Sequence, residues 1–433
     1  MTCLKLMPLA VCALTVTVSA QDPLARINQE TTKFTPALTE IRHQIHQHPE
    51  LSNREEKTAA LVADYLRKLG LEVRTGVARH GVVAILKGGQ PGPVIAVRAD
   101  MDALPVTEQT NLPYASKLRT TFLGQDVGVM HACGHDIHTA VQLGVASVLV
   151  GMKNELPGTV KFIFQGAEEG PPPGEEGGAS LMVKEGVLQN PRPQAIFALH
   201  AMSEMTVGDV GYFEGPALAG ADTWEVKITG KQAHGARPEL SIDPIVTAAE
   251  FAVALQTIRS RSFAGNEPGV VTIATIHGGQ RHNIIPTDVS LTGTIRTFSP
   301  EMSALGEQRL RTILKGITDA NGATGEVVRY DRHAPATIND LALTRESVPA
   351  LERAVGKDHV KRLPPSMVSE DFSYFANDVP GFYFRLGQVP PGTTSSDHHT
   401  PMFTADDSAI PVGVRAMSYL LYDYLSRHAK PKL

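Results

Sequence analysis

Residues Gly158–Gly170 read GTVKFIFQGAEEG, an apolar run followed at once by two adjacent carboxylates. The β-branched and aromatic residues of this run predict a buried strand that ends at Gln165. Strands of this kind belong to α/β sheets, whose functional residues gather at the carboxyl ends of the strands. Glu168 and Glu169 are therefore predicted to lie at a sheet edge, where one carboxylate can ligate a metal and the other can accept a proton. Taken alone, such a pair is more often a solvated turn.

The segments on either side of this run alternate between strands and helices. Apolar runs predict strands at 82–86, 94–97 and 195–199. Helical periodicity extends from Pro36 to Gly70 and predicts a helix at 55–68, and a second helix is predicted at 139–150. Beyond Gly215 the order becomes strand, helix, strand, strand, helix, strand, which is typical of the split βαβ sandwich. At 433 residues the chain is also long for one hydrophobic core.

We therefore predict the α/β class, with a catalytic α/β domain that carries its site at strand ends. This domain would comprise residues 21–215 and 334–433. Residues 216–333 would form an inserted, ferredoxin-like α+β domain. The formal net charge of −5 gives no reason to expect a nucleic-acid partner, because such domains usually carry clustered positive charge.

The N-terminal segment is typical of an export signal. Lys5 precedes an apolar run from Leu6 to Val18, and Val18-Ser19-Ala20 offers the small residues of a cleavage site. We predict a signal peptide over residues 1–20, a periplasmic or secreted mature protein, and no membrane association after cleavage. The alternatives are a membrane anchor or a buried first helix; lipid attachment at Cys12 is disfavoured by the bulky Val11.

The densest histidine cluster of the chain contains its one mature thiol. Residues 130–138 read MHACGHDIH, and the other two cysteines fall in the predicted signal, so Cys133 has no partner for an internal disulfide. Cys133 and His135 offer a thiolate and an imidazole two residues apart, which suits a borderline-soft divalent metal. Two alternatives are surface histidines beside a buried cysteine, and a cysteine hydrolase in which His135 activates Cys133 as the nucleophile.

Three further segments place metal-binding side chains after predicted strands. Asp100 and Asp102 follow the strand 94–97, where they can ligate, orient a histidine ligand or cap a helix. His200 ends the strand 195–199, and a polar loop at 397–401 reads DHHTP. Together these segments predict a metal site at the sheet edge.

With these motifs in place, the chain resembles the metal-dependent aminoacylase and carboxypeptidase family, in the branch of hippurate hydrolase and the auxin-amino-acid conjugate hydrolases. The resemblance extends from about residue 36 to 425. It is carried by the motifs Arg98–Pro105, His131–His138, Gln165–Gly170, Ala198–His200, Gly230–Pro238, Ser369–Phe372 and His399–Pro401.

The resemblance implies two divalent metal ions, zinc or manganese first and cobalt or nickel as alternatives. It assigns the metal ligands, with Cys133 as the bridge, to Cys133, His135, Glu169, His200 and His399. It makes Glu168 the general base, and it selects His399 over His398 because His399 stands two residues before Pro401. The implied activity is hydrolysis of the amide bond of N-acyl amino acids or small peptides, and the alternative is a non-catalytic periplasmic metal or amino-acid binding protein.

The resemblance also gives the inserted domain the role of a lid and dimerisation domain, and implies a homodimer. His234 would support the oxyanion, and Asn283 and Arg296 would hold the substrate carboxylate. The alternatives are a turn asparagine and a surface arginine. One departure from the family is the loop Pro171–Glu176, which follows the Glu-Glu-Gly and adds a second Glu-Glu pair beside the predicted site.

Overall fold

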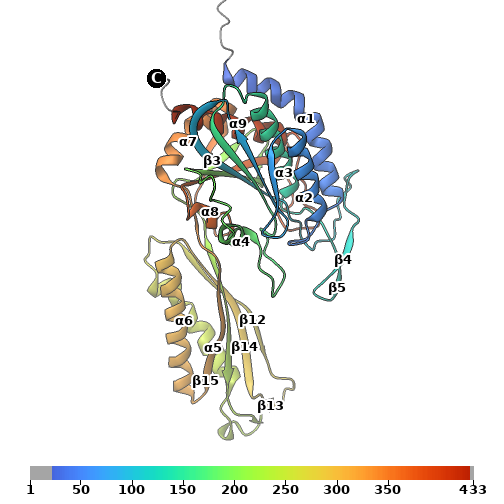
Figure 1. Ribbon diagram of the computed structural model, residues 1–433. Helices are drawn as coiled ribbons and strands as arrows, with labels where there is room; N and C mark the ends of the chain where they lie inside the picture. Colours follow the sequence, from blue (N-terminus) through green and yellow to red (C-terminus); the bar gives the residue numbers. More distant parts are fainter. Residues whose placement is uncertain (1–21, 430–433) are drawn as a thin grey trace, which may run out of the picture.

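The computed structural model describes residues 22–429 and contains two large sheets, each with its own helices (Figure 1). The predicted signal peptide and Cys12 lie outside the described residues. No helix between residues 22 and 429 is long and apolar enough to cross a membrane.

The larger sheet has eight strands and a parallel centre. Across the sheet the strands are β1 (Glu72–Val77), β2 (Gly81–Lys87), β6 (Pro157–Gln165), β3 (Gln90–Asp100), β7 (Ile196–Thr206), β18 (Gly381–Val389), β8 (Val210–Tyr212) and β17 (Val360–Arg362). The neighbours β6, β3, β7 and β18 are parallel to one another, so their carboxyl ends meet at one edge. This edge positions the site.

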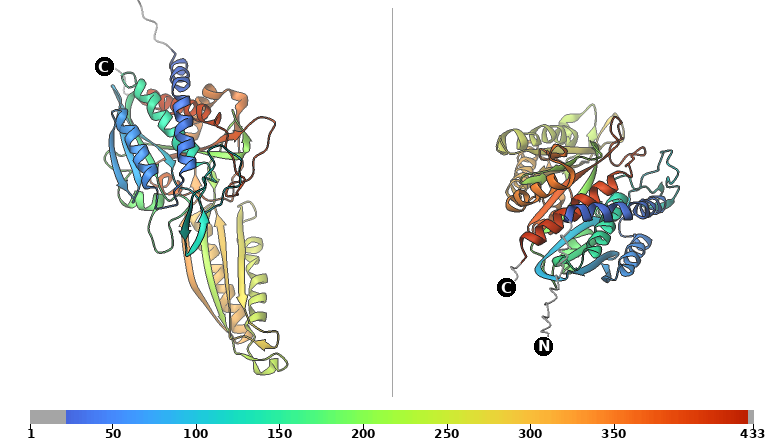
Figure 2. Two further views of the ribbon diagram at one scale, coloured as in Figure 1. Left: turned by 90° about the vertical axis from the view of Figure 1, so that its right-hand side faces the viewer. Right: turned by 90° about the horizontal axis from the view of Figure 1, so that it is seen from above.

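Helices bury both faces of the larger sheet (Figure 2). The main core packs helices α1 (Pro23–Gln47), α2 (Glu56–Lys68), α3 (His135–Gly151), α7 (Leu341–Val355) and α9 (Ala409–Arg427) on the sheet. A smaller core on the opposite face includes side chains of α4 (Gly178–Lys184) and α8 (Ser373–Ala376). Burial on both faces explains why the central strands are continuously apolar.

Two helices begin earlier than the sequence patterns predict. α1 begins at Pro23, not Pro36, because Asp22 caps it by accepting a hydrogen bond from the Leu24 amide at 3.3 Å. α3 begins at His135 rather than Thr139, because Gly134, with φ at 93°, lets the chain turn directly into the helix. The second shift places His135 and His138 in the first helical turn.

The smaller sheet contains the predicted split βαβ order. Its strands are β10 (Gly220–Thr229), β12 (Gly269–Gly278), β14 (Asp288–Thr297) and β15 (Thr324–Ala334), in the order β12-β14-β10-β15. Helices α5 (Pro244–Leu255) and α6 (Pro300–Asn321) cover one face, with Trp224, Phe251 and Leu310 in the core. The predicted fold class is therefore confirmed. We call this unit, residues 220–334, the lid.

The lid is joined to the larger body by two chain connections that lie side by side. β9 (Pro216–Leu218) pairs with β16 (Thr337–Ile338), and β10 pairs with β15 immediately beyond them. The lid projects away from the body (Figure 1). Two further two-stranded sheets complete the fold: the hairpin of β4 (Arg119–Phe122) with β5 (Gln125–Gly128), and the antiparallel pair of β11 (Ala233–His234) with β13 (Ile284–Ile285).

Candidate metal centre

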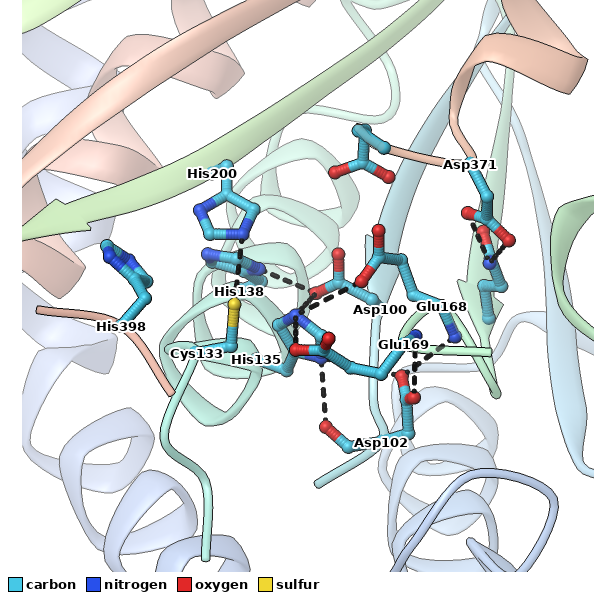
Figure 3. Close-up of polar contacts among 12 residues, drawn as sticks. Asp100, Asp102, Cys133, His135, His138, Glu168, Glu169, His200, Asp371 and His398 are labelled. Atoms are coloured by element: carbon cyan, nitrogen blue, oxygen red, sulfur yellow. Dashed lines mark hydrogen bonds and ion pairs between the residues drawn. The ribbon is translucent and has the colours of Figure 1, made fainter. Parts of the chain in front are cut away.

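The five predicted metal ligands lie together at the carboxyl edge of the larger sheet (Figure 3 labels all but His399). Cys133, His135 and His200 form one group of ligand atoms within 4.8 Å of one another, and Cys133, Glu169 and His399 form a second. Cys133 Sγ lies 3.5 Å from His200 Nε2 and 3.4 Å from His399 Nε2. Cys133 is the residue that both groups share, so it would be a ligand of both divalent ions.

Hydrogen bonds fix the tautomers of the two buried histidine ligands. His135 Nδ1 donates to the Asp102 carbonyl oxygen at 2.9 Å, and His200 Nδ1 donates to the Ala201 carbonyl oxygen at 2.7 Å. In its neutral form each ring therefore has its lone pair on Nε2, the nitrogen that faces the cluster. His135 Nε2 is buried without a hydrogen-bond partner among the described residues, as is Glu169 Oε1. Such unpaired buried atoms fit a set of metal ligands.

The neighbouring histidines have other roles. His138 Nε2 accepts the Ala201 amide at 2.7 Å, so its Nδ1 carries the proton that it donates to Asp100 at 2.5 Å. His398 uses Nε2 to donate to the Ala201 carbonyl oxygen at 3.0 Å and Nδ1 to accept from Ser203 Oγ at 3.1 Å. His399 Nε2 instead faces Cys133 and also lies 3.2 Å from Glu169 Oε1. The geometry thus favours His399 over His398 as a ligand.

Glu168 lies beside the ligands in a largely buried position. Its Oε2 is 3.7 Å from His135 Nε2, and it forms a further group with Glu370 and Asp371 within 4.8 Å. Burial, followed by these carboxylates and Glu169, raises the pKa of Glu168 well above its usual range. A carboxyl group held in this way is suited to accept and return a proton.

Two buried carboxylates hold the turn that carries Glu168 and Glu169. Asp102 accepts the amides of Glu168 and Glu169, each at 3.0 Å, with its two carboxylate oxygens. Glu55 Oε1 accepts the amide of Ala167 at 2.8 Å, and Ala167 adopts a left-handed φ of 55°. Burial, followed by the charge of Asp102, raises the pKa of Glu55 to about 8. Three successive amides are therefore fixed before any ligand binds.

Arg98 joins the strand ends beneath the site. It is buried in β3 and donates to Gln165 Oε1 at 2.8 Å, Asp100 Oδ2 at 2.7 Å and Glu370 Oε1 at 2.9 Å. A fourth bond reaches Asp371 Oδ1 at 3.0 Å. The sequence motifs assign no role to Arg98 or Glu55, although a charged residue such as Arg98 inside an apolar strand is a signal for such a network.

The protonation of the metal-free site differs from what metal binding requires. Burial, then the charges of Glu169 and Glu168, raise the pKa of the Cys133 thiol well above its usual range. Burial lowers the pKa of His135, but Asp100 and Asp102 outweigh it and raise that pKa to about 10. Burial and the neighbouring His138 lower the pKa of His200. A divalent cation would therefore displace protons from Cys133 and His135 and find His200 already neutral.

The predicted lid residues do not join the cluster within one chain. His234 is exposed in the small β11–β13 sheet, beside Asn283, whose carbonyl oxygen accepts the Gly235 amide at 2.8 Å. Arg296 lies at the opposite end of β14, where it donates to the Met367 carbonyl oxygen at 2.9 Å. β14 separates these positions by about 30 Å at the usual rise of a strand. Their roles stay predictions.

The second Glu-Glu pair, in the loop Pro171–Glu176, is directed away from the metal ligands. Glu175 accepts from Arg54 at 2.6 Å and from Asn53 at 3.0 Å, and Glu176 pairs with Lys184 at 2.7 Å. The loop is thereby tied to the segment that precedes α2. Glu168 and Glu169 are the acidic pair that the structure places at the cluster.

Comparison with known proteins identifies the family of this chain. Residues 96–423 match the model of the peptidase family M20/M25/M40. The chain belongs to this family. The resemblance inferred from the sequence motifs is thereby confirmed.

Relatives within the M20 family include two enzymes that match nearly the whole chain. An N-acetyl-L-cysteine deacetylase of Bacillus subtilis is 38% identical over 389 residues, which cover 89% of this chain and 87% of the relative. Thermostable carboxypeptidase 1 of Saccharolobus solfataricus is 35% identical over 408 residues, 94% of this chain and 100% of the relative.

A crystal structure of an M20 relative has the same fold. The YXEP protein of Bacillus subtilis, described as a dinuclear metal binding peptidase, superposes with a TM-score of 0.75 at 34% identity. The superposition covers 91% of this chain and 99% of that protein.

Proposed function

We propose that this M20 protein is a two-metal amidohydrolase that cleaves the amide bond of N-acyl amino acids or small peptides, with Glu168 as the general base. The observation that carries the proposal is the shared position of Cys133 in two ligand groups, with Glu168 beside them. The named activities of relatives at 35% identity and above, a deacetylase and a carboxypeptidase, both break amide bonds and support this class.

The residues of the site have separable tasks. Cys133, His135, Glu169, His200 and His399 would hold two divalent ions, of which zinc or manganese suit the mixed ligand set best and cobalt or nickel are alternatives. The ions would supply Lewis acidity, which acidifies a water molecule and polarises the substrate carbonyl. Glu168 accepts the proton of that water at its carboxylate and returns it to the leaving amine. Asp102 and Glu55 keep the Glu168 backbone in place during both transfers.

A cysteine-nucleophile mechanism fits the site less well. A nucleophilic cysteine needs a lowered pKa, whereas burial and two carboxylates raise the pKa of Cys133. His200 Nε2, at 3.5 Å, could accept its proton, but burial lowers the pKa of that ring. The raised pKa of Cys133 and the lowered pKa of His200 both keep the proton on the thiol, which argues against a nucleophile. Cys133 is better suited to be a metal ligand that loses its proton when the metal binds.

The experiment that tests the proposal measures free amino acid released from a panel of N-acetyl, N-benzoyl and indole-acetyl amino acids and dipeptides. Activity should be lost on chelation and restored by Zn²⁺ or Mn²⁺. Glu168→Gln should lower kcat by about 10²- to 10⁴-fold while retaining the metal content. Glu176→Gln, an exposed carboxylate on the neighbouring loop, is the matched control and should leave the rate unchanged. Activity that survives complete metal removal would refute the mechanism, and stoichiometric metal binding without turnover would favour a binding protein.

We further propose that the lid mediates a homodimer. β12 is an edge strand of the lid sheet, and the exposed apolar side chains Ile276 on β12 and Val253 on α5 have exposed fractions of 52% and 75%. Unpaired edges and exposed apolar side chains favour association. Sedimentation velocity should show a dimer that Val253→Asp weakens; a monomer at micromolar concentration would contradict this.

Export of the mature protein is proposed on the N-terminal pattern alone. Cell fractionation should place the protein outside the cytoplasm, with its N-terminus near Gln21. An uncleaved cytoplasmic product would overturn the prediction.

A further inference from the structure

A buried arginine lies next to the metal ligands on the strand beside His200. Arg385 of β18 stands directly opposite His200 of β7 in the parallel register. Side chains alternate along each strand, and both Ala198 and Tyr383 belong to the smaller core on one face of the sheet. His200 and Arg385, two residues further along each strand, therefore project from that same face.

The guanidinium of Arg385 has no anionic partner among residues 22–429. Arg385 is only 4% exposed, yet no carboxylate of the described residues forms an ion pair with it. Its one hydrogen bond goes to the thioether sulfur of Met202, a weak acceptor that carries no charge. The rings of Tyr383 and Phe213 lie 5.4 and 5.9 Å from the guanidinium carbon and support it from the apolar side.

The contrast with the two other buried arginines is informative. Arg98 donates to three carboxylates, and Arg42 donates to Asp136 at 2.7 Å and to Asp407 at 3.1 Å. Buried charges are normally paired in this way, because an isolated ion pays a large desolvation cost. Arg385 alone of the three lacks such a partner in the described chain. Within residues 22–429 its Nε and Nη2 donate no hydrogen bond, and they are not fully shut off from solvent.

The position of Arg385 makes an anionic ligand the natural partner. Arg385 pairs in register with the metal ligand His200, so its guanidinium lies on the strand next to the ligand cluster. Two divalent ions at the neighbouring ligands would add more positive charge to the same space. A guanidinium offers a planar fork of donors that matches a carboxylate in bidentate geometry.

We propose that Arg385 is a substrate-binding residue that receives a carboxylate of the substrate beside the metal centre. The inference rests on the proposed amidohydrolase function and names the chemistry that its substrate must carry. Two sources supply that chemistry: the α-carboxylate of the released amino acid, or a second carboxylate in an acidic side chain. Arg296, the residue that the family resemblance assigns to the carboxylate, is engaged by the Met367 carbonyl oxygen in this structure.

The test compares matched substrates on metal-loaded enzyme. N-acetylmethionine and N-acetylmethionine amide differ only in the α-carboxylate, and N-acetylglutamate and N-acetylglutamine differ only in the side-chain charge. The variants are Arg385→Met, which keeps an unbranched side chain without charge, and Arg385→Lys, which keeps the charge without the fork. Arg362→Met removes an exposed arginine from β17 and is the matched control. Thermal unfolding verifies that each variant is folded.

The expected result is a selective loss in kcat/KM of about 10- to 100-fold for Arg385→Met, the size of one charge-assisted hydrogen-bonded pair. If the loss falls on all free acids and spares the methionine amide, the α-carboxylate is the ligand. If it falls on N-acetylglutamate alone, the side-chain carboxylate is the ligand. Arg385→Lys should recover part of the lost rate in either case. Equal losses for charged and neutral substrates would overturn the proposal and leave Arg385 a structural residue.

A separate binding measurement keeps the two proposals distinguishable. If the wild type hydrolyses none of the substrates, the amidohydrolase proposal fails, but calorimetric titration with N-acetylglutamate and succinate still tests Arg385. Binding that weakens at least 10-fold in Arg385→Met and is retained in Arg362→Met would support the carboxylate subsite. Equal affinity in all variants, or no binding to the wild type, would refute it.

Discussion

Replacing Glu55 by glutamine should remove a pH-dependent loss of stability. Glu55 is fully buried, accepts the amides of Asn53 and Ala167 at 2.9 and 2.8 Å, and leaves its Oε2 without a partner in the described structure. Burial and the nearby charge of Asp102 raise its pKa from 4.5 to about 8. Because the folded state holds this proton more tightly than the unfolded state, stability is fully present below pH 4.5. It falls as the pH rises, until the group is ionised above pH 8.

The size of the effect follows from the same values. The difference between a pKa of 4.5 and one of about 8 corresponds to about 5 kcal/mol, and about 4 kcal/mol of this falls between pH 5 and 9. Glutamine keeps an oxygen acceptor for both amides and cannot ionise. The free energy of unfolding of Glu55→Gln should therefore rise relative to wild type by up to that amount over this pH range.

Urea unfolding of metal-free protein, followed by circular dichroism at several pH values, measures this difference. Glu56→Gln is the matched control, because Glu56 is the next residue in the chain and its carboxylate is exposed. A difference between Glu55→Gln and wild type that does not change with pH would refute the reasoning. A pH dependence reproduced by Glu56→Gln would refute it equally.

Three other predictions concern the residues around the ligands. Arg98→Met should cost about 3–5 kcal/mol at pH 8, because it leaves buried carboxylates uncompensated. Thermal unfolding should show a smaller cost at pH 5, because burial raises the pKa of Asp371 to about 7 and this group can then protonate; a constant cost would contradict this. Asp102→Asn should weaken zinc binding by about 10- to 100-fold in a competition titration with a chromophoric chelator. Asp126→Asn, at an exposed ion pair, should not, and unchanged affinity in both would exclude the positioning role of Asp102. In metal-free protein, Cys133 should react with iodoacetamide more slowly than free cysteine at pH 7.5, with a rate still rising beyond pH 9, because its pKa is raised; fast reaction that levels off near neutral pH would instead indicate an activated nucleophile.

The sequence was sufficient to predict the fold class and the set of residues that meets at the sheet edge. Strand runs such as 158–165 carry a strong apolar signal, and the segment around Cys133 combines several ligand types within a few residues. The lid was predictable because its strands alternate buried and exposed residues, as β14 does throughout. Short strands with no such pattern, including the three-residue β8 and β17, were missed.

The supporting contacts could not be predicted because they join residues that are distant in the sequence. The bond from Arg98 to Glu370 spans 272 positions, and the bond from the Ala167 amide to Glu55 spans 112. No periodic pattern encodes such pairs, since each side chain is placed by the packing of a different strand or helix. Helix starts were misplaced for a related reason: the side-chain cap at Asp22 and the left-handed Gly134 act through backbone geometry rather than hydrophobic pattern.

The pair of strand connections between the lid and the body restricts how the two can move. Ala221 pairs with Ala334 and Leu218 pairs with Thr337, so both crossings are fastened to each other along their length. A domain joined by one flexible chain connection can rotate in many directions. Two connecting strands that are hydrogen-bonded to each other must instead bend together, as a hinge does. We expect the lid to move relative to the body mainly by rotation about one axis. A distance sensor between the lid tip and the body should therefore report one relaxation, and a single cross-link across the opening should arrest it completely.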